Sequence, residues 1–369
     1  MELLNSTEMT AGYTLGMDRE GRESLVVAVK GTFAIPGGSG EPFLCERQKP
    51  LVEADVFSGE PGFSAPVYEC DYAPFKPRCD VVLNGSAYAP QGRPGKMVPV
   101  CLKVGPITKM FNVVGNRRWE KGLLLSGVSK TEPFTMMPIS YDNAFGGVDD
   151  SDKEPSRHRA CLENPVGVGF HGNSSEDVFD GLPLPNTEHI GEPVTKSNGK
   201  YRPVAFGPVG RGWEPRCRFA GTYDQHWIDN VFPFLPHDFS DEYFQCAPPD
   251  QQMGYLQGGE KVLLVNLTPM GRTEFRIPGI EVPIAFFYKK GGHHQTHAVA
   301  DTFVIEPDEN RFMITWRASL PLKKNIFEIS QVLAGTMSRT WWRARETGKK
   351  YYGSLEELCK SKRQDFSED

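Results

Sequence analysis

Glycine and proline interrupt this sequence at short intervals along almost its whole length. The 369 residues include 38 glycines and 30 prolines, a high share for a globular chain. Between these breaks lie short runs rich in valine, phenylalanine and isoleucine, which favour strands. Such frequent breaks argue against a helical bundle and favour many short strands joined by turns. We therefore expect a mainly β protein with antiparallel sheets, sandwich-like or barrel-like.

The predicted strands fall into two regions. The first holds strand-like runs at 23–35, 79–88, 98–104 and 109–114, and the second holds runs at 261–267, 273–277, 284–288, 302–306 and 311–317. The length fits two domains or one large all-β unit. We expect four parts: an N-terminal β region over 1–148, a long irregular connection over 149–212, a second β region with an aromatic cluster over 213–322, and a helical segment over 323–369. The connection should pack over the surface or junction of the sheets.

Helical signals are confined to the C-terminal segment. Residues 325–345 carry apolar side chains near helical spacing, which predicts a helix. Ser354-Leu-Glu-Glu357 is a capping-box pattern and predicts the start of a second short helix.

Charge and cysteine usage narrow the class of protein. The formal net charge is −6, so the chain lacks the basic footprint of a nucleic-acid binder. No run approaches the roughly 18 apolar residues of a membrane helix, and the first residues lack the basic start of a signal peptide. The eight cysteines are scattered without a Cys-x-x-Cys pair, a pattern typical of reduced thiols. We expect a cytoplasmic protein that contacts neither nucleic acid nor membrane.

Three histidines near residue 295 raise the question of a metal site. His293 and His297 have the spacing that lets two imidazoles on a helix share a metal. Gly291 and Gly292 precede them, however, and strands flank them. A polar hairpin loop that includes His294 is therefore the favoured interpretation, with a weak transition-metal site as the alternative.

Two further motifs resemble an acylation site and a calcium loop, but their residues favour turns. Ser197-Asn-Gly-Lys200 matches the Ser-x-x-Lys acylation motif, but that motif needs a helix, and Gly199 and Pro203 favour a turn. The acidic run at 149–154 resembles a calcium loop, but Pro155 stands where such a loop needs glycine. We expect no metal and no cofactor.

The densest cluster of functional residue types lies between residues 213 and 251. Aspartate in a Gly-punctuated or Pro-punctuated turn typically accepts backbone N–H bonds, and Arg216 or Arg218 is placed to pair with such a carboxylate. Structural roles are therefore expected for Arg216, Asp224, Asp238, Asp250 and Gln251. Tryptophan and tyrosine are enriched at interface hot spots, so the candidates for partner contact are Trp213, Tyr223 and Trp227, with burial in the same corner as the alternative for each.

A second interpretation of this cluster is a carbohydrate-active hydrolase or carbohydrate-binding protein. Asp224, Asp238 or Asp250 would then face a cleft lined by Trp213 and Trp227. Paired carboxylates about 5–10 Å apart would favour hydrolysis, whereas a broad apolar groove or an exposed sheet edge would favour protein binding. The sequence has neither a Gly-x-Ser-x-Gly elbow nor a complete phosphate-binding loop, but the absence of these motifs does not exclude an enzyme.

Several segments, taken in order, resemble one known family. They are FGPVGRGWEPR at 206–216, AGTYDQHW at 220–227, LPHDF at 235–239 and APPDQ at 247–251, with VAVKGTF at 27–33, KPRCDVVLNG at 76–85, YDNAFGG at 141–147, NPVGVGF at 164–170 and LPNTE at 184–188. Their number and order resemble the family called domain of unknown function 2169, over roughly residues 12–320. Thr187 departs from the pattern, where an apolar residue is expected.

The resemblance implies an accessory protein of the bacterial type VI secretion system. Such a protein is a non-enzymatic cytoplasmic adaptor or chaperone. It binds a cognate secreted effector, or the spike-tip protein that carries it, and helps to load the effector for export. The resemblance brings no catalytic residues, and the acidic, unsignalled composition agrees with it.

Overall fold

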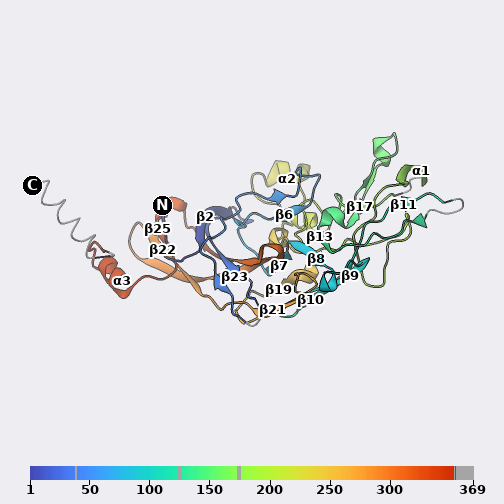
Figure 1. Cartoon of the computed structure of the whole chain (residues 1–369). Helices are drawn as coiled ribbons and strands as arrows, with labels where there is room; N and C mark the ends of the chain where they lie inside the picture. Colours follow the sequence, from blue (N-terminus) through green and yellow to red (C-terminus); the bar gives the residue numbers. More distant parts are fainter. Residues whose placement is uncertain (38–39, 123–126, 173–175, 353, 355–369) are drawn as a thin grey trace, which may run out of the picture.

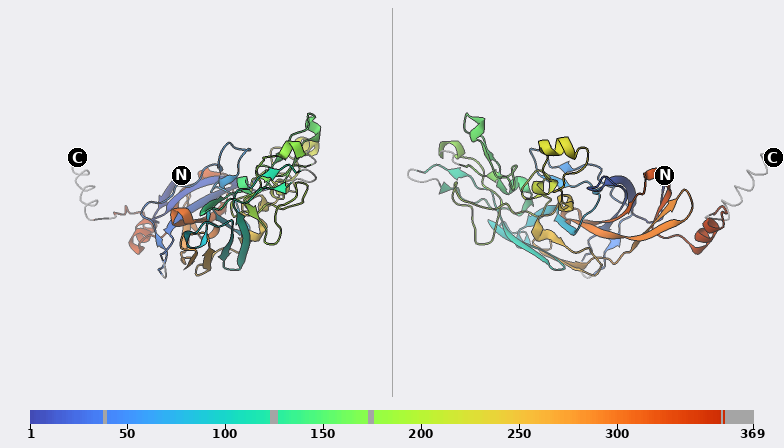
Figure 2. Two further views of the ribbon diagram at one scale, coloured as in Figure 1. Left: turned by 45° about the vertical axis from the view of Figure 1, so that its right-hand side comes forward. Right: turned by 180° about the vertical axis from the view of Figure 1, so that it is seen from behind.

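The computed structural model describes residues 1–37, 40–122, 127–172, 176–352 and 354. The molecule is elongated and mainly β (Figures 1 and 2). Helix α3 (Arg339–Glu346) lies near one end together with the N-terminus, and α1 (Glu176–Phe179) lies toward the other (Figure 1). The predicted mainly β class is confirmed.

The larger sheet has ten strands and is nearly closed on itself. Its main path runs through β1 (Glu2–Asn5), β25 (Ile329–Ala334), β22 (Val282–Tyr288), β23 (His293–Glu306), β24 (Arg311–Pro321), β3 (Glu23–Ala34) and β2 (Thr10–Met17), and it is extended by β4 (Phe43–Leu44), β7 (Cys79–Leu83) and β19 (Gln252–Met253). Neighbouring strands are antiparallel except for the parallel pairs β1–β25 and β7–β23. The edge strands β1 and β2 contact each other, so the sheet resembles a barrel.

The smaller sheet packs against the same core. Its five strands are, in spatial order, β18 (Thr187–Glu188), β10 (Ile107–Val114), β9 (Met97–Val104), β20 (Lys261–Val265) and β21 (Arg272–Arg276). Phe275 of β21 stacks on Phe312 of β24, with 5.2 Å between ring centroids. On its other side, Phe312 stacks on Phe33 of β3, also at 5.2 Å. Stacked rings that join the sheets place one continuous apolar core between them.

Strands from both ends of the sequence pair with one another. β3 pairs with β24, so that Phe33 lies opposite Phe312, and β9 pairs with β20. β7 lies parallel to the second half of β23. The two predicted β regions, 1–148 and 213–322, therefore build common sheets instead of separate ones, because each supplies neighbours that the other needs.

The central segment is mostly irregular, as the sequence predicts. It contains β15 (Val148–Asp149), β16 (Arg159–Ala160), β17 (Val168–Gly169), α1 and β18. Phe206 lies in the main core, where its ring centroid is 4.5 Å from that of Phe111 on β10. Its carbonyl accepts a hydrogen bond from the N–H of Leu83 on β7 at 3.0 Å. The segment thus covers the junction of the two sheets.

The C-terminal segment differs from its prediction. Ile329–Ala334 forms strand β25, between β1 and β22, so the helix expected over 325–345 is restricted to α3. Backbone pairing with two strands outweighs the helix-like spacing of the apolar side chains. The capping box at 354–357 falls, apart from Ser354, outside the described residues. Within the described chain, no helix has the length and apolar character needed to cross a membrane.

The remaining elements are short. The strands are β5 (Val56–Phe57), β6 (Pro66–Tyr68), β8 (Gly85–Tyr88), β11 (Trp119–Glu120), β12 (Gly127–Val128), β13 (Met136–Ile139) and β14 (Phe145–Gly146). The α-helix α2 covers Gln225–Asn230, and the 3-10 helices are η1 (Pro90–Gly92), η2 (Tyr141–Asn143), η3 (Pro155–Arg157), η4 (Arg216–Ala220), η5 (Asp241–Phe244), η6 (Pro249–Gln251), η7 (Pro307–Glu309) and η8 (Ile326–Glu328).

Candidate functional site

The first part of the predicted aromatic cluster is buried. Trp213 is 7% exposed and belongs to the main core. Its ring meets that of Tyr141 edge-on, with 5.6 Å between centroids. A side chain in the core is closed to a partner protein, so the expectation that Trp213 is an exposed anchor is wrong. Its alternative, burial, is confirmed.

Arg216 is a buried structural residue. Its guanidinium donates two hydrogen bonds to Glu69, from Nη1 to Oε2 at 2.9 Å and from Nη2 to Oε1 at 2.5 Å. It also donates to the carbonyls of Val209 and Tyr243, at 2.8 and 2.9 Å. Burial alone would lower the pKa of Arg216, but the bonds to Glu69 raise it. The partner of Arg216 is thus a glutamate from outside the cluster and not one of the aspartates that the sequence suggested.

Asp224 and Asp238 bind backbone in turns, as the sequence predicts. Asp224 caps helix α2, where its Oδ1 accepts the N–H of Trp227 at 2.9 Å. Asp238 accepts the N–H of Thr222 at 2.9 Å and its hydroxyl at 2.7 Å. The Thr222 N–H bond lowers the pKa of Asp238 below its usual range. Both aspartates are exposed, so their turns are surface features.

Asp250 and Gln251 are neighbours in the chain, but Asp250 is exposed and Gln251 is buried. Asp250 pairs with Lys109 of β10 at 3.1 Å, and its side chain is 59% exposed. Gln251 is fully buried. Its amide donates to the carbonyls of Val81 and Phe206, at 2.7 and 2.9 Å, and its Oε1 accepts from Lys109 at 2.8 Å. Gln251 therefore joins β7, β10 and the central segment.

These positions do not assemble the cleft of the hydrolase interpretation. Trp213 lies in the core, whereas Trp227 lies on the surface helix α2. Asp224 and Asp238 are engaged by backbone N–H groups, and Asp250 is engaged by a lysine of β10. The two tryptophans thus do not line one cavity, and this observation gives a carbohydrate site no support.

The second part of the predicted cluster forms an exposed apolar surface on and around α2. We call this surface the α2 patch and define it by five residues: Tyr223, Trp227, Ile228, Phe232 and Phe234. Tyr223, Ile228 and Phe232 are 52%, 55% and 67% exposed. The half-buried Trp227 joins them, since its ring meets that of Tyr223 at 4.7 Å and that of Phe232 at 5.5 Å, both edge-on. Tyr223 and Trp227 therefore belong to one aromatic cluster at the surface.

The α2 patch is held in place by local contacts. Asp224 caps the helix, and the indole Nε1 of Trp227 donates to the carbonyl of Phe234 at 2.9 Å. The ring of Phe234 lies against Gly21 in the turn before β3, where a Cβ atom would approach that ring to 2.3 Å. Exposed aromatic side chains on a fixed support are typical of binding surfaces. Sequence reasoning missed Ile228, Phe232 and Phe234, and their closeness to Trp227 in the chain was the available signal.

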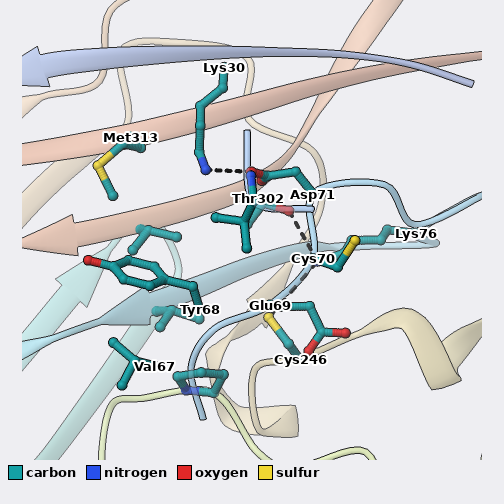
Figure 3. A pocket seen from close by; sticks show the side chains of 14 residues that line it. Lys30, Val67, Tyr68, Glu69, Cys70, Asp71, Lys76, Cys246, Thr302 and Met313 are labelled. Carbon is teal, nitrogen blue, oxygen red and sulfur yellow. Dashed lines mark hydrogen bonds and ion pairs between the residues drawn. The ribbon is translucent and has the colours of Figure 1, made fainter. Parts of the chain in front are cut away.

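A buried network of six charged side chains was also missed. It consists of three ion pairs: Lys30–Asp71 at 2.5 Å, Lys76–Asp80 at 2.7 Å and Arg317–Asp301 at 2.7 Å. Each side chain is 6% exposed or less. Lys30, Asp301 and Arg317 belong to β3, β23 and β24, and Figure 3 shows the Lys30–Asp71 pair.

The carboxylates of this network also bind loops to the sheet. Asp80 accepts the N–H groups of Cys246 and Ala247, at 2.9 and 3.2 Å. Asp71 accepts the N–H of Val52 at 2.7 Å. The network therefore fixes two irregular stretches, at Val52 and at Cys246–Ala247, and its positive and negative charges balance.

A small cavity lies within the network (Figure 3). Its volume is about 20 Å³, which is room for roughly one water molecule. Burial would lower the pKa of Lys76, but the charge of Asp80 outweighs burial and raises it. Burial raises the pKa of the Cys246 thiol well above its usual range. With its cations and carboxylates already paired, this cavity has a structural role.

The sequence held a signal for the network. Lys30 and Arg317 each lie within a strand that is otherwise mainly apolar. Charges inside such strands indicate ion pairs, since an unpaired buried charge is costly.

The other sequence motifs lie on the surface, the histidines in strand β23 instead of the predicted hairpin loop and the other two motifs in a turn and a loop. His293 and His294 follow the hairpin turn at 288–292 and lie at the exposed start of β23. Among the described residues, no cluster of three or more His, Cys, Asp and Glu side chains is arranged to hold a metal ion. The segment from Ser197 to Lys200 is a turn, with Gly199 N–H bonded to the carbonyl of residue 196 at 3.1 Å, and residues 150–154 form an exposed loop.

Comparison with known proteins identifies a family. A family model described as "Uncharacterized protein conserved in bacteria (DUF2169)" matches residues 20–317. A search of the curated proteins and one of the solved structures found no match. The matched region contains the buried network, the Arg216–Glu69 pair and the α2 patch. Because the match covers most of the chain, this protein belongs to the DUF2169 family.

Proposed function

We propose that this protein is a non-enzymatic accessory protein of a bacterial type VI secretion system. It acts in the cytoplasm as an adaptor or chaperone. It binds a cognate secreted effector, or the spike-tip protein that carries the effector, and helps to load it for export. The ordered series of segments that resemble the family supports this role.

The α2 patch is the observation that carries the proposal. Tyr223 and Trp227 come from the segments that resemble the family, and they lie on the surface, where the ring of Trp227 also meets that of Phe232. A monomeric protein gains nothing from exposing large aromatic side chains together, whereas a binding surface uses them as anchors. We assign the client contact to this patch.

The physical demands on an adaptor agree with such a patch. An adaptor covers apolar surface on its client and then releases the client at the spike. A few aromatic anchors within an interface of standard size provide affinity without an obligate complex. The fixed support of the patch reduces the entropy that is lost on binding.

The test is co-expression with the toxin encoded by the neighbouring gene, followed by pull-down and a secretion assay. We expect the toxin to copurify with this protein and to lose that association in the variant Ile228→Ser with Phe232→Ser. Phe327→Ser is the matched control, because Phe327 is 73% exposed and lies outside the patch. Unchanged toxin level and unchanged export after deletion of this gene would refute the adaptor role.

A further inference from the structure

The surface around the α2 patch is strongly acidic. Residues 219–245 contain no lysine and no arginine. The same segment contains five acidic residues: Asp224, Asp229, Asp238, Asp241 and Glu242. The chain as a whole has 41 basic and 47 acidic residues, so this imbalance is local.

These acidic side chains face solvent. Asp224, Asp229, Asp238 and Glu242 are exposed, and Asp241 is half-buried. Burial raises the pKa of Asp241, with a smaller opposing effect of Arg19. Asp224 and Asp238 bind turn N–H groups, and these neutral partners leave the negative charge in place.

The neighbouring cations do not cancel this charge. Arg22 pairs with Asp18 and Glu20, at 3.0 and 3.1 Å. Arg218 pairs with Glu214. The Arg19 guanidinium donates to the carbonyl of Phe239 at 3.3 Å and is the one cation among these without a paired carboxylate. The α2 patch thus combines exposed aromatic side chains with a negative rim.

We propose that the α2 patch binds a protein segment in which large apolar side chains are flanked by lysine or arginine. That this segment belongs to a secreted client rests on the proposed function. The chemistry of the segment follows from the side chains of the α2 patch alone. The apolar side chains pack on Tyr223, Ile228 and Phe232 and supply affinity. The basic side chains meet the acidic rim, which speeds encounter and disfavours acidic segments.

The acidic rim determines which amphipathic segments the α2 patch binds. An apolar patch without charges would accept an acidic amphipathic segment as readily as a basic one. The acidic rim selects the basic segment, and the selection weakens as salt screens charges beyond about 8 Å at physiological ionic strength. An anionic membrane surface is disfavoured by the same repulsion.

The first experiment uses two synthetic amphipathic peptides of equal length as probes. One is built from leucine and lysine, and the other from leucine and glutamate. Titration into the full-length protein, followed by calorimetry, should show binding of the lysine peptide that weakens with added salt, and no binding of the glutamate peptide. Equal binding of both peptides, or no binding of the lysine peptide, overturns the proposal.

Double variants test whether the lysine peptide binds at the α2 patch. Asp229→Asn with Glu242→Gln removes two exposed charges and leaves the hydrogen bonds of Asp224 and Asp238 in place, and it should weaken binding of the lysine peptide about three- to tenfold. Ile228→Ser with Phe232→Ser should weaken it at least about tenfold. Asp150→Asn with Asp152→Asn is the matched charge control, in an exposed loop at 150–154, and it should bind like the parent.

The client assay separates this inference from the proposed function. If the toxin copurifies equally with the parent and with the Asp229→Asn, Glu242→Gln variant at every salt concentration, the acidic rim has no role and the inference fails while the adaptor role stands. If the parent retains the lysine peptide but no toxin, the adaptor role fails while the chemistry of the patch stands.

Discussion

Arg216 and Glu69 lie 147 positions apart in the sequence and meet in a buried two-bond ion pair, at 2.9 and 2.5 Å. Glu69→Gln would leave the Arg216 guanidinium buried without its countercharge. Breaking a buried pair at one side costs about 3–5 kcal/mol, and we expect a loss of that size in the free energy of unfolding, measured with denaturant. The exposed Glu60→Gln, in the same stretch of chain, should change it by less than about 0.5 kcal/mol. Equal losses from the two variants would contradict this account.

Gln251→Leu tests the junction of the sheets. The substitution removes the amide group that donates hydrogen bonds to the carbonyls of Val81 and Phe206. Stranded buried groups cost about 1–3 kcal/mol each, so we expect the variant to lose about 2–4 kcal/mol of stability. Gln257→Leu, at an exposed position further along the chain, is the control, and its effect should stay below about 0.5 kcal/mol. A Gln251→Leu protein as stable as the parent would exclude a joining role.

Asp224→Asn and Asp224→Ala should behave differently. As an exposed cap, Asp224 contributes one acceptor to the N–H of Trp227. Asparagine caps helices about as well as aspartate, whereas alanine costs about 0.5–2 kcal/mol. Because Asp224 is exposed, Asp224→Asn should leave the melting temperature almost unchanged. Thermal unfolding of both variants checks this, and an equal loss in both would show that capping is not the reason.

His171 gives the stability a dependence on pH. Burial lowers the pKa of this imidazole below its ordinary value of 6.5, with a smaller opposing effect of Asp149. As the pH falls below about 6.5, the unfolded chain therefore binds more protons than the folded one, and stability decreases. His171→Phe keeps a ring against Phe179, on which His171 stacks at 5.1 Å, and does not titrate.

The melting temperature of the His171→Phe protein should therefore fall less steeply than that of the parent between about pH 7 and pH 5. Above this range the imidazole is neutral in both states and adds no slope. His294→Gln, on the exposed start of β23, is the control and should retain the parental slope. Parallel curves for the parent and His171→Phe would rule out a contribution from His171.

The sequence predicts most of the longer strands, such as β3, β9 and β24, because their apolar runs end at glycine and proline, but it misses β1, β2 and the two-residue strands. It fails at Ile329–Ala334, where Ile329 and Leu333 also fit a helical period. Pairing with β1 and β22 decides the outcome there, and such pairing depends on residues remote in the chain. For the same reason the sequence could not show that the two β regions share their sheets.

The candidate site was predicted in part. Aspartates in turns are local features, so the roles of Asp224 and Asp238 follow from neighbouring residues. Trp213 and Trp227 have similar local contexts, yet one lies in the core and the other on the surface. That difference depends on what the rest of the chain packs against each ring. The pairing of Arg216 with Glu69 could not be predicted either, because the two residues are far apart in the sequence.

The pairing of β3 with β24 has a consequence for synthesis of the chain. Phe33 meets Phe312 only after the intervening residues have been made, which takes roughly fifteen seconds to a minute at about 5–20 residues per second. Throughout that time the apolar residues 25–29 lack the strand that covers one side of them. A nascent chain with such an uncovered edge is prone to aggregate. Folding of this protein in a cell should therefore depend on factors that hold the emerging chain until β24 leaves the ribosome.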